Sequence, residues 1–328
     1  MKKILYIRRN PDRKADGTAT YCNALYGMFA NDGDCRALPI RNYPVWNIPL
    51  LKYIYKPKHI KEAIKDADII HINGYTALGT IQALIYSKLQ HKEVVYIAHW
   101  HPFQFLRHPN LARIVFNVIF KPTIRICAEK VITINNEDTA YFSGFCKNVF
   151  QIRHWQTPSE TTISNTAKQA DMILFVGRID DPVKNFQMLM NLPSGKFDIH
   201  CIGRGETTLR SDMTQHINIS KEELTLLYRK ASLVVIPSKY EAFSYVALEA
   251  LSNGTPVVMS DRVRIADYLE NQSGYSVFKY NDTDDFIHKV TQTIGSKVDT
   301  AAINRIFSID SIKDIYKKMY LCTIKEKS

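Results

Sequence analysis

The pair of glutamates Glu241 and Glu249 is the strongest candidate for chemistry in this sequence. Residues 245–252 have helical spacing, so Glu241 precedes an expected helix and Glu249 lies within it. At a helix start the backbone N–H groups are free and the helix dipole favours a phosphate; the residues there are Phe243, Ser244 and Tyr245. One carboxylate could face a sugar while the other reaches nucleotide hydroxyls. The alternative is two surface glutamates, one of them capping a helix.

A glycine and two cations follow the first expected strand of the second half of the chain. Gly177 would let the chain turn and approach a ligand closely. Arg178 and Lys184 bracket a short loop, so both could reach one diphosphate. Arginine offers a fork of donors and lysine a mobile point charge. The alternative is two solvated basic residues at the end of a strand.

The first half of the chain offers a histidine and a glycine at comparable places. His99 stands at the carboxyl end of the expected strand 94–98, and His101 follows two residues later. Such a histidine could serve a substrate or be a satisfied structural residue. Gly17 lies where the loop after the first expected strand opens into a helix.

Short apolar runs rich in β-branched residues alternate with amphipathic stretches along the chain. The expected strands are 3–8, 69–73, 94–98, 130–134, 148–152, 172–176, 197–202, 233–237, 256–259 and 275–278. The expected helices include 18–31, 76–89, 111–128, 221–230 and 245–252. Strands that are apolar throughout indicate parallel sheets covered by helices, and the alternation of strand and helix gives βαβ units.

The polar, Ser- and Thr-rich stretch 154–170 predicts a linker between two domains. We therefore expect an α/β protein with two Rossmann-like domains, 1–155 and 171–310, whose parallel sheets face a central cleft. A terminal helix, 311–328, could pack back on the N-terminal domain. Ligands of open α/β sheets bind beyond the carboxyl ends of the strands, so the site should lie in the loops there.

The chain is basic, with 43 Lys and Arg against 32 Asp and Glu and a formal charge of +11. Nucleic acid, anionic lipid and phosphorylated substrates are all suitable partners, and a solvated basic surface is the alternative. The 6 cysteines form no Cys-x-x-Cys pair, which argues against zinc and indicates free thiols in a reducing cytoplasm. No signal peptide and no membrane-spanning run is evident, so a cytoplasmic location is expected.

Taken together, these segments resemble the retaining glycosyltransferases of the GT-B fold, family 4 (glycosyl transferases group 1). The resemblance rests on a strand ending in Val-Gly177-Arg178, then Lys184-Asn185, the block from Glu241 to Glu249, and Gly254-Thr-Pro-Val-Val. It is specific over residues 172–278 and looser before them. It implies an acceptor-binding domain at 1–155 and a nucleotide-sugar-binding domain at 171–310.

The resemblance also implies roles for the candidate residues. Arg178 and Lys184 would hold the donor diphosphate, Glu241 would lie near the transferred sugar, and Glu249 would bind the ribose hydroxyls. The other implied site residues are His99 (with His101 as second choice), near the sugar, and Gly17, Gly177, Gly203, Asn218, Phe243, Ser244 and Tyr245 around the donor. The family often has glycine where Ser244 stands, so this side chain could narrow the sugar pocket or add a hydroxyl contact. We draw no role from the segment 153–156, where the family usually has Asn-Gly.

The implied reaction is attack by an acceptor hydroxyl on the anomeric carbon, with loss of a nucleoside diphosphate. The centre passes through an oxocarbenium-like state, and the departing phosphate carries the negative charge to be stabilised. Two cations and a helix dipole could do this without a divalent metal, and Asp282-Thr-Asp284 is more typical of a helix cap than of a metal site. We expect no cofactor and a donor linked to UDP. Retention of anomeric configuration is implied by the family alone.

Basic residues mixed with aromatics in segments 43–58 and 107–125 suit an anionic membrane face. For 107–125 the alternative is an ordinary core helix. We therefore expect a peripheral enzyme acting on a glycan or lipid-linked glycan in bacterial lipopolysaccharide, O-antigen or capsule synthesis. The competing interpretations are a basic nucleic-acid-binding protein, a non-catalytic sugar-nucleotide-binding protein, and an epimerase or phosphorylase on the same fold.

Overall fold

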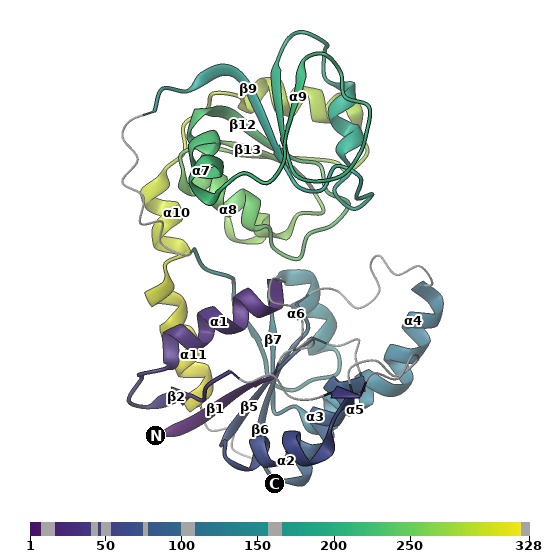
Figure 1. Cartoon of the computed structure of the whole chain (residues 1–328), viewed down its shortest axis with the longest axis vertical. Coiled ribbons are helices and arrows are strands. Elements are labelled where there is room, and N and C mark those ends of the chain that lie inside the picture. The colour runs from purple at the N-terminus through teal and green to yellow at the C-terminus, as the bar shows by residue number, and fades with distance from the viewer. Residues whose placement is uncertain are drawn as a thin grey trace. The chain divides into compact units, whose positions relative to one another are not determined.

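The computed structural model describes residues 1–7, 17–40, 45–46, 54–74, 78–99, 109–156 and 166–322. The chain forms two compact units (Figure 1). The first comprises Met1–Ile152 with the C-terminal segment from Ile312, and the second comprises Arg153–Ser311. His101, most of segment 43–58, residues 107–108 and the polar stretch 157–165 lie outside the described residues.

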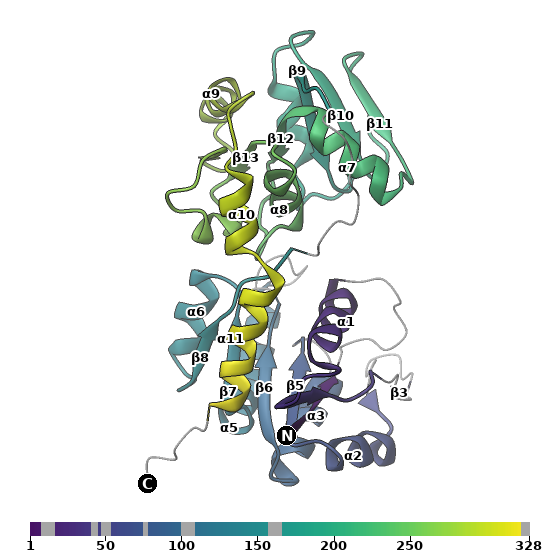
Figure 2. The ribbon, with the colours of Figure 1, turned by 90° about the vertical axis from the view of Figure 1, so that its left-hand side faces the viewer.

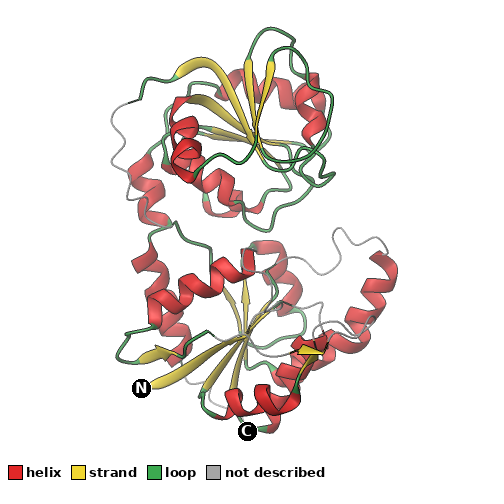
Figure 3. Ribbon diagram, viewed as in Figure 1, coloured by secondary structure: helices red, strands yellow, loops and turns green. Residues whose placement is uncertain are grey.

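The first unit is built on a parallel sheet of 6 strands in the order β2-β1-β5-β6-β7-β8. These strands are β1 (Lys2–Ile7), β2 (Cys35–Ala37), β5 (Ile69–Asn73), β6 (Glu93–Ile97), β7 (Lys130–Thr133) and β8 (Val149–Gln151). β5 and β7 are buried along their whole length, because helices cover both faces of the sheet. The antiparallel pair β3 (Val45–Trp46) and β4 (Ile54–Tyr55) stands apart from it (Figure 3).

The helices of the first unit follow the strands in βαβ order. They are α1 (Gly17–Phe29), α2 (Pro57–Lys65), α3 (Leu78–Leu89), α4 (Pro109–Val115), α5 (Lys121–Cys127), α6 (Asn136–Ser143) and the last helix, α11 (Ile309–Leu321). A π-helical turn, η1 (Phe116–Phe120), joins α4 to α5. The expected single helix at 111–128 is thus three helical segments in succession.

The second unit has a sheet of 6 parallel strands in the order β11-β10-β9-β12-β13-β14. Its strands are β9 (Gln169–Val176), β10 (Asp198–Ile202), β11 (Met213–His216), β12 (Ala231–Ile236), β13 (Val257–Ser260) and β14 (Tyr275–Phe278). The helical elements are η2 (Phe186–Asn191), α7 (Lys221–Lys230), α8 (Tyr245–Ser252), η3 (Arg264–Tyr268), α9 (Thr283–Thr293) and α10 (Thr300–Ile306). The prediction of two α/β units, each with a parallel sheet, is confirmed.

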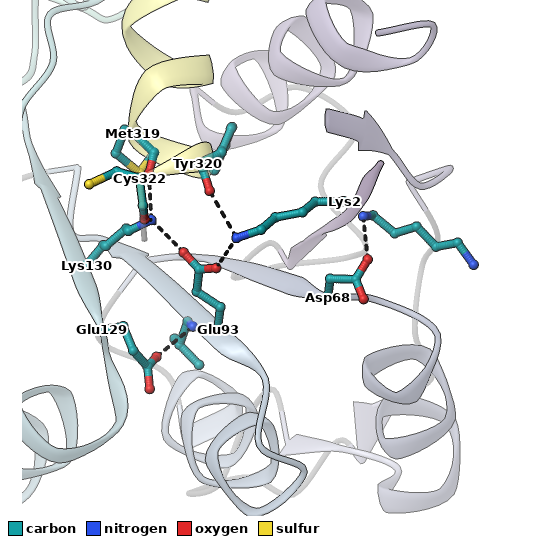
Figure 4. Close-up of polar contacts among 10 residues, drawn as sticks. Lys2, Asp68, Glu93, Glu129, Lys130, Met319, Tyr320 and Cys322 are labelled. Carbon is teal, nitrogen blue, oxygen red and sulfur yellow. Dashed lines mark hydrogen bonds and ion pairs between the residues drawn. The ribbon is translucent and has the colours of Figure 1, made fainter. Parts of the chain in front are cut away.

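The C-terminal helix α11 is held on the sheet of the first unit by a buried lysine (Figures 2 and 4). Lys130 on β7 is fully buried, and its Nζ donates to Glu93 Oε1 at 2.5 Å and to the carbonyls of Met319 and Cys322 at 2.6 and 2.7 Å. Lys2 on β1 donates to the other oxygen of Glu93 at 2.7 Å and to the Tyr320 carbonyl at 3.4 Å. Because the last carbonyls of a helix have no partners within the helix, cations are favoured there. Two strands of the sheet thus cap the end of α11.

Candidate active site

The carboxyl ends of β9 and β10 meet so closely that only glycine fits between them. The backbone N–H of Gly177 donates to the Ile202 carbonyl at 2.9 Å. Gly203 has a φ of +150°, and a Cβ placed on it would lie 2.0 Å from the carbonyl oxygen of Gly177. Gly205 is similarly packed, since its Cβ would lie 2.6 Å from Asp180 Oδ1. These contacts fix the course of the loop that carries Arg178 and Lys184.

Lys184 and Glu241 form an ion pair in the second unit. Lys184 Nζ lies 2.8 Å from Glu241 Oε1, and the hydroxyl of Ser238 donates to the same oxygen at 2.8 Å. The carboxylate is largely buried and the lysine is partly exposed. The aliphatic stem of Lys184 passes over Gly177, where a Cβ would meet it at 3.3 Å. Two candidate residues that lie 57 positions apart in the sequence therefore touch.

Arg178 does not take part in this contact. Its Nε lies 3.3 Å from Asp180 Oδ1, and its side chain is 65% exposed. Within the part of the chain that the structure describes, the guanidinium contacts neither Lys184 nor Glu241. The convergence of both cations on one point therefore stays a prediction.

Helix α8 begins at Tyr245, four residues after Glu241. Ser244 is its N-cap, with φ of 122° and ψ of 100°, and its hydroxyl accepts from the Ala247 N–H at 3.4 Å. Among the described residues, no acceptor faces the N–H groups of Tyr245 and Val246. A positive φ is strained for a side chain such as serine, typically by about 1–3 kcal/mol. The backbone at Ser244 is thus one that glycine adopts readily.

A pocket in the second unit surrounds Glu249. The hydroxyl of Tyr228 donates to Glu249 Oε2 at 3.0 Å. Burial raises the pKa of the Glu249 carboxyl, while the hydrogen bond from Tyr228 and the charge of Lys221 act in the opposite direction. The pocket is lined by Trp155, Gln156, Lys221, Leu224, Thr225, Tyr228, Tyr245, Leu248, Glu249 and Asn253. A carboxylate in such a partly closed site can accept hydrogen bonds from the hydroxyls of a sugar.

The segment 153–156, to which the sequence analysis gave no role, packs beside the pocket around Glu249. The His154 ring stacks on Tyr245 with 5.1 Å between centroids and meets the edge of Phe243 at 5.1 Å. Burial lowers the pKa of His154 to about 3, so the ring is neutral. Gln156 accepts from the Ser252 hydroxyl at 2.8 Å. Since these contacts join residues some 90 positions apart, no local pattern could have indicated them.

Asn218 also stands at the carboxyl edge of this sheet. It follows β11 with φ of 58°, and its Oδ1 accepts from Arg204 Nη2 at 2.8 Å and Nε at 3.2 Å. Arg204 lies between the two close-packed glycines Gly203 and Gly205. The loops after β10 and β11 are thereby tied together, although Arg204 was not among the predicted site residues.

The two candidates of the first unit stand at the carboxyl edge of the other sheet. His99 follows β6, is half-buried, and its Nε2 lies 2.9 Å from Asn73 Oδ1. Gly17 is the first residue of α1.

In the described ranges, no three His, Cys, Asp or Glu side chains are grouped so as to hold a metal ion. No described helix has the length and apolar character needed to cross a membrane.

Comparison with solved structures identifies the architecture as the GT-B fold. The Anabaena protein HepE, solved with UDP and glucose, superposes with a TM-score of 0.71 at 14% identity over 98% of this chain and 99% of that one. The lipopolysaccharide outer core galactosyltransferase WaaB superposes with a TM-score of 0.68 at 15% identity over 97% and 99%. At such low identity these likenesses establish the fold alone.

Within that fold class, residues 170–296 match the family model of the glycosyl transferases group 1. A segment of 64 residues, 19% of this chain, is 41% identical to an uncharacterized glycosyltransferase of Methanocaldococcus jannaschii and spans 16% of that protein. Longer but weaker matches to other curated glycosyltransferases span about a third of their length. These findings support the placement of this chain in the glycosyltransferase superfamily.

Proposed function

We propose that this protein is a retaining, metal-independent glycosyltransferase that uses a nucleoside-diphosphate sugar, with UDP as the favoured carrier. The observation that carries the proposal is the ion pair between Lys184 and Glu241, at 2.8 Å, next to the N-terminus of α8. This pair, together with N–H groups of Tyr245 and Val246 that face no acceptor among the described residues, supports a site for a departing diphosphate. The match of residues 170–296 to glycosyl transferases group 1 and the UDP in the HepE structure support the donor class.

In the proposed reaction an acceptor hydroxyl forms a new bond to the anomeric carbon as the bond to the diphosphate oxygen breaks. The electron pair of that bond leaves with the nucleoside diphosphate, and Lys184, Arg178 and the α8 N-terminus would stabilise its charge. Arg178 is exposed, so it can turn from Asp180 to a bound diphosphate. Glu241 holds Lys184 in place until the donor arrives. Glu249 would accept hydrogen bonds from the ribose, and the departing phosphate would take the acceptor proton.

The test is a panel of nucleotide sugars assayed by release of nucleoside diphosphate with and without glycan acceptors. We expect release with one donor class and a loss of about 100-fold or more in Lys184→Ala and Glu241→Ala. Lys196→Ala is the matched control, because that lysine lies over the ring of Phe197 in the same unit and precedes the amino end of β10. Unchanged release in the first two variants would remove the site assignment. Where a glycosylated product forms, NMR of its anomeric centre decides between retention and inversion.

We also propose that the acceptor is a lipid-linked glycan of bacterial surface polysaccharide synthesis, met at an anionic membrane face. The support is a helical surface made of α4, η1 and α5 (Figure 1). Phe116 and Phe120, two aromatics of the segment 107–125, are buried in the core, as the alternative of an ordinary core helix predicted. Other apolar residues are exposed instead: Ile114 at 59%, Val118 at 68% and Ile126 at 67%.

The charges of this surface favour an anionic partner. Arg113, Lys121 and Arg125 lie among its exposed apolar residues, and residues 94–128 contain no Asp or Glu. Apolar side chains next to cations suit the boundary between lipid headgroups and acyl chains. The net charge of +11 opposes self-association and favours the same partner.

Co-sedimentation with vesicles tests this docking. Wild-type protein should bind vesicles of phosphatidylcholine with phosphatidylglycerol more than phosphatidylcholine alone. The double variant Ile114→Gln/Val118→Gln should bind at least about 10-fold more weakly, since each buried aliphatic side chain contributes about 1.5–3 kcal/mol. The control is Ile85→Gln/Leu89→Gln, on exposed residues of α3. Equal recovery with both vesicle types would refute membrane docking and leave the transferase assignment untouched.

A further inference from the structure

Asn73 has its side-chain amide fixed in one orientation. It is the last residue of β5 and is 1% exposed. Its Nδ2 faces two backbone carbonyls, that of Ile7 at 3.1 Å and that of His71 at 3.4 Å. An amide turned the other way would place its oxygen against both carbonyl oxygens, which repel it. The Oδ1 of Asn73 is therefore the atom that faces His99.

This orientation determines where the neutral His99 ring carries its proton. His99 Nε2 lies 2.9 Å from Asn73 Oδ1. Since an amide oxygen can only accept a hydrogen bond, Nε2 must donate. A neutral imidazole has one N–H, so Nδ1 is then the acceptor nitrogen of the ring.

The plane of the His99 ring is also fixed. The edge of Tyr21 on α1 meets it at 4.5 Å between centroids and 83° between planes. The hydroxyl of Tyr21 is hydrogen-bonded to that of Tyr316 on α11. His99 itself has a left-handed backbone, with φ of 64°, which costs about 1–3 kcal/mol in a residue other than glycine. Asn73 and Tyr21 thus fix the His99 ring in one orientation although the backbone of His99 is strained. Such support by neighbouring residues is typical of a functional side chain.

We propose that Asn73 is a positioning residue that keeps His99 in the Nε2–H tautomer, so that Nδ1 is the ring atom that accepts a hydrogen bond from a hydroxyl of the transferred sugar. This inference rests on the proposed function and on the family resemblance, which implies that His99 lies near that sugar. Asn73 acts through His99 and does not touch the substrate.

Two measurements test the proposal. Nitrogen-15 NMR of the wild-type protein, with the His99 signal assigned by His99→Gln, should show the Nε2–H tautomer when the ring is neutral. Asn73→Leu should lose this preference and lower kcat by about 10-fold, the value of one net hydrogen bond, with donor KM little changed. Asn148→Leu is the matched control, since among the described residues its amide donates to the Glu129 carbonyl in the same unit.

The outcomes separate this inference from the proposed function. An Nδ1–H tautomer in the wild-type protein would overturn it, as would unchanged kcat and tautomer in Asn73→Leu. If Asn73→Leu does not fold, the wild-type spectrum alone decides. Full activity of His99→Ala together with the expected tautomer would leave the Asn73 contact standing and remove His99 from the proposed reaction.

Discussion

Substitution of Gly203 by alanine should disable the proposed donor site without removing any functional group. The added Cβ would lie 2.0 Å from the Gly177 carbonyl oxygen and 2.7 Å from its carbonyl carbon, whereas ordinary contact begins at 3.4 Å. Both atoms belong to the backbone, so the loop carrying Arg178 and Lys184 has to move by roughly 1 Å. A displacement of that size at a reacting centre can cost about 100-fold in rate. The overpacking should also lower the free energy of unfolding by about 1–3 kcal/mol.

The assay compares donor affinity by calorimetry with the rate of nucleoside diphosphate release, and thermal unfolding shows that the variant is folded. Gly195→Ala is the control: Gly195 has φ of +72° in the same unit, but open space surrounds its Cβ position. It therefore carries the strain of a positive φ without the clash. We expect a loss of activity in Gly203→Ala alone. Wild-type donor affinity and rate in a folded Gly203→Ala protein would refute the argument that this glycine positions the loop carrying Arg178 and Lys184 for the proposed donor.

Three further predictions follow from buried polar groups. Lys130→Met should lower the free energy of unfolding of the first unit by roughly 3 kcal/mol and speed hydrogen exchange in α11, because a buried ion pair loses one partner. The control, Lys88→Met, removes one partner of an exposed ion pair and should change stability little. Equal effects of the two substitutions would contradict the prediction. Burial lowers the pKa of His71 from 6.5 to about 3, so between these values the unfolded chain takes up a proton that the folded chain does not, and stability falls as pH falls. His71→Asn should flatten the decrease of Tm over this range, and an unchanged slope would be evidence against it. Tyr228→Phe removes a hydrogen bond that lowers the pKa of Glu249, so this pKa should rise further. As pH falls, the Glu249 carboxylate is then protonated earlier, and donor binding should weaken at a higher pH than in the wild type. Superimposable pH profiles of KM would count against the proposed role of Glu249.

The candidate site was only partly predictable from the sequence. Gly177, Lys184 and Glu241 follow recognisable strands, and parallel strands bring their carboxyl ends to one edge, so their proximity could be expected. The contact of His154 with Tyr245, and that of Tyr228 with Glu249, could not be expected from local spacing. The aromatic residues of 107–125 illustrate the same limit, since helical periodicity does not indicate which face of a helix is covered.

By itself, the sequence determined the two parallel sheets and the places where strands give way to loops, because burial on both faces requires continuous apolar runs. The tertiary structure decided how the groups in those loops interact. It paired Lys184 with Glu241, left Arg178 with Asp180, and brought β9 and β10 so close that Gly203 has no room for a side chain. It also joined Asn73 to His99 across neighbouring strands. The physical reason is that hydrogen bonds and contact distances depend on residues far apart in the chain, whereas the apolar runs that predict buried strands are continuous in the sequence.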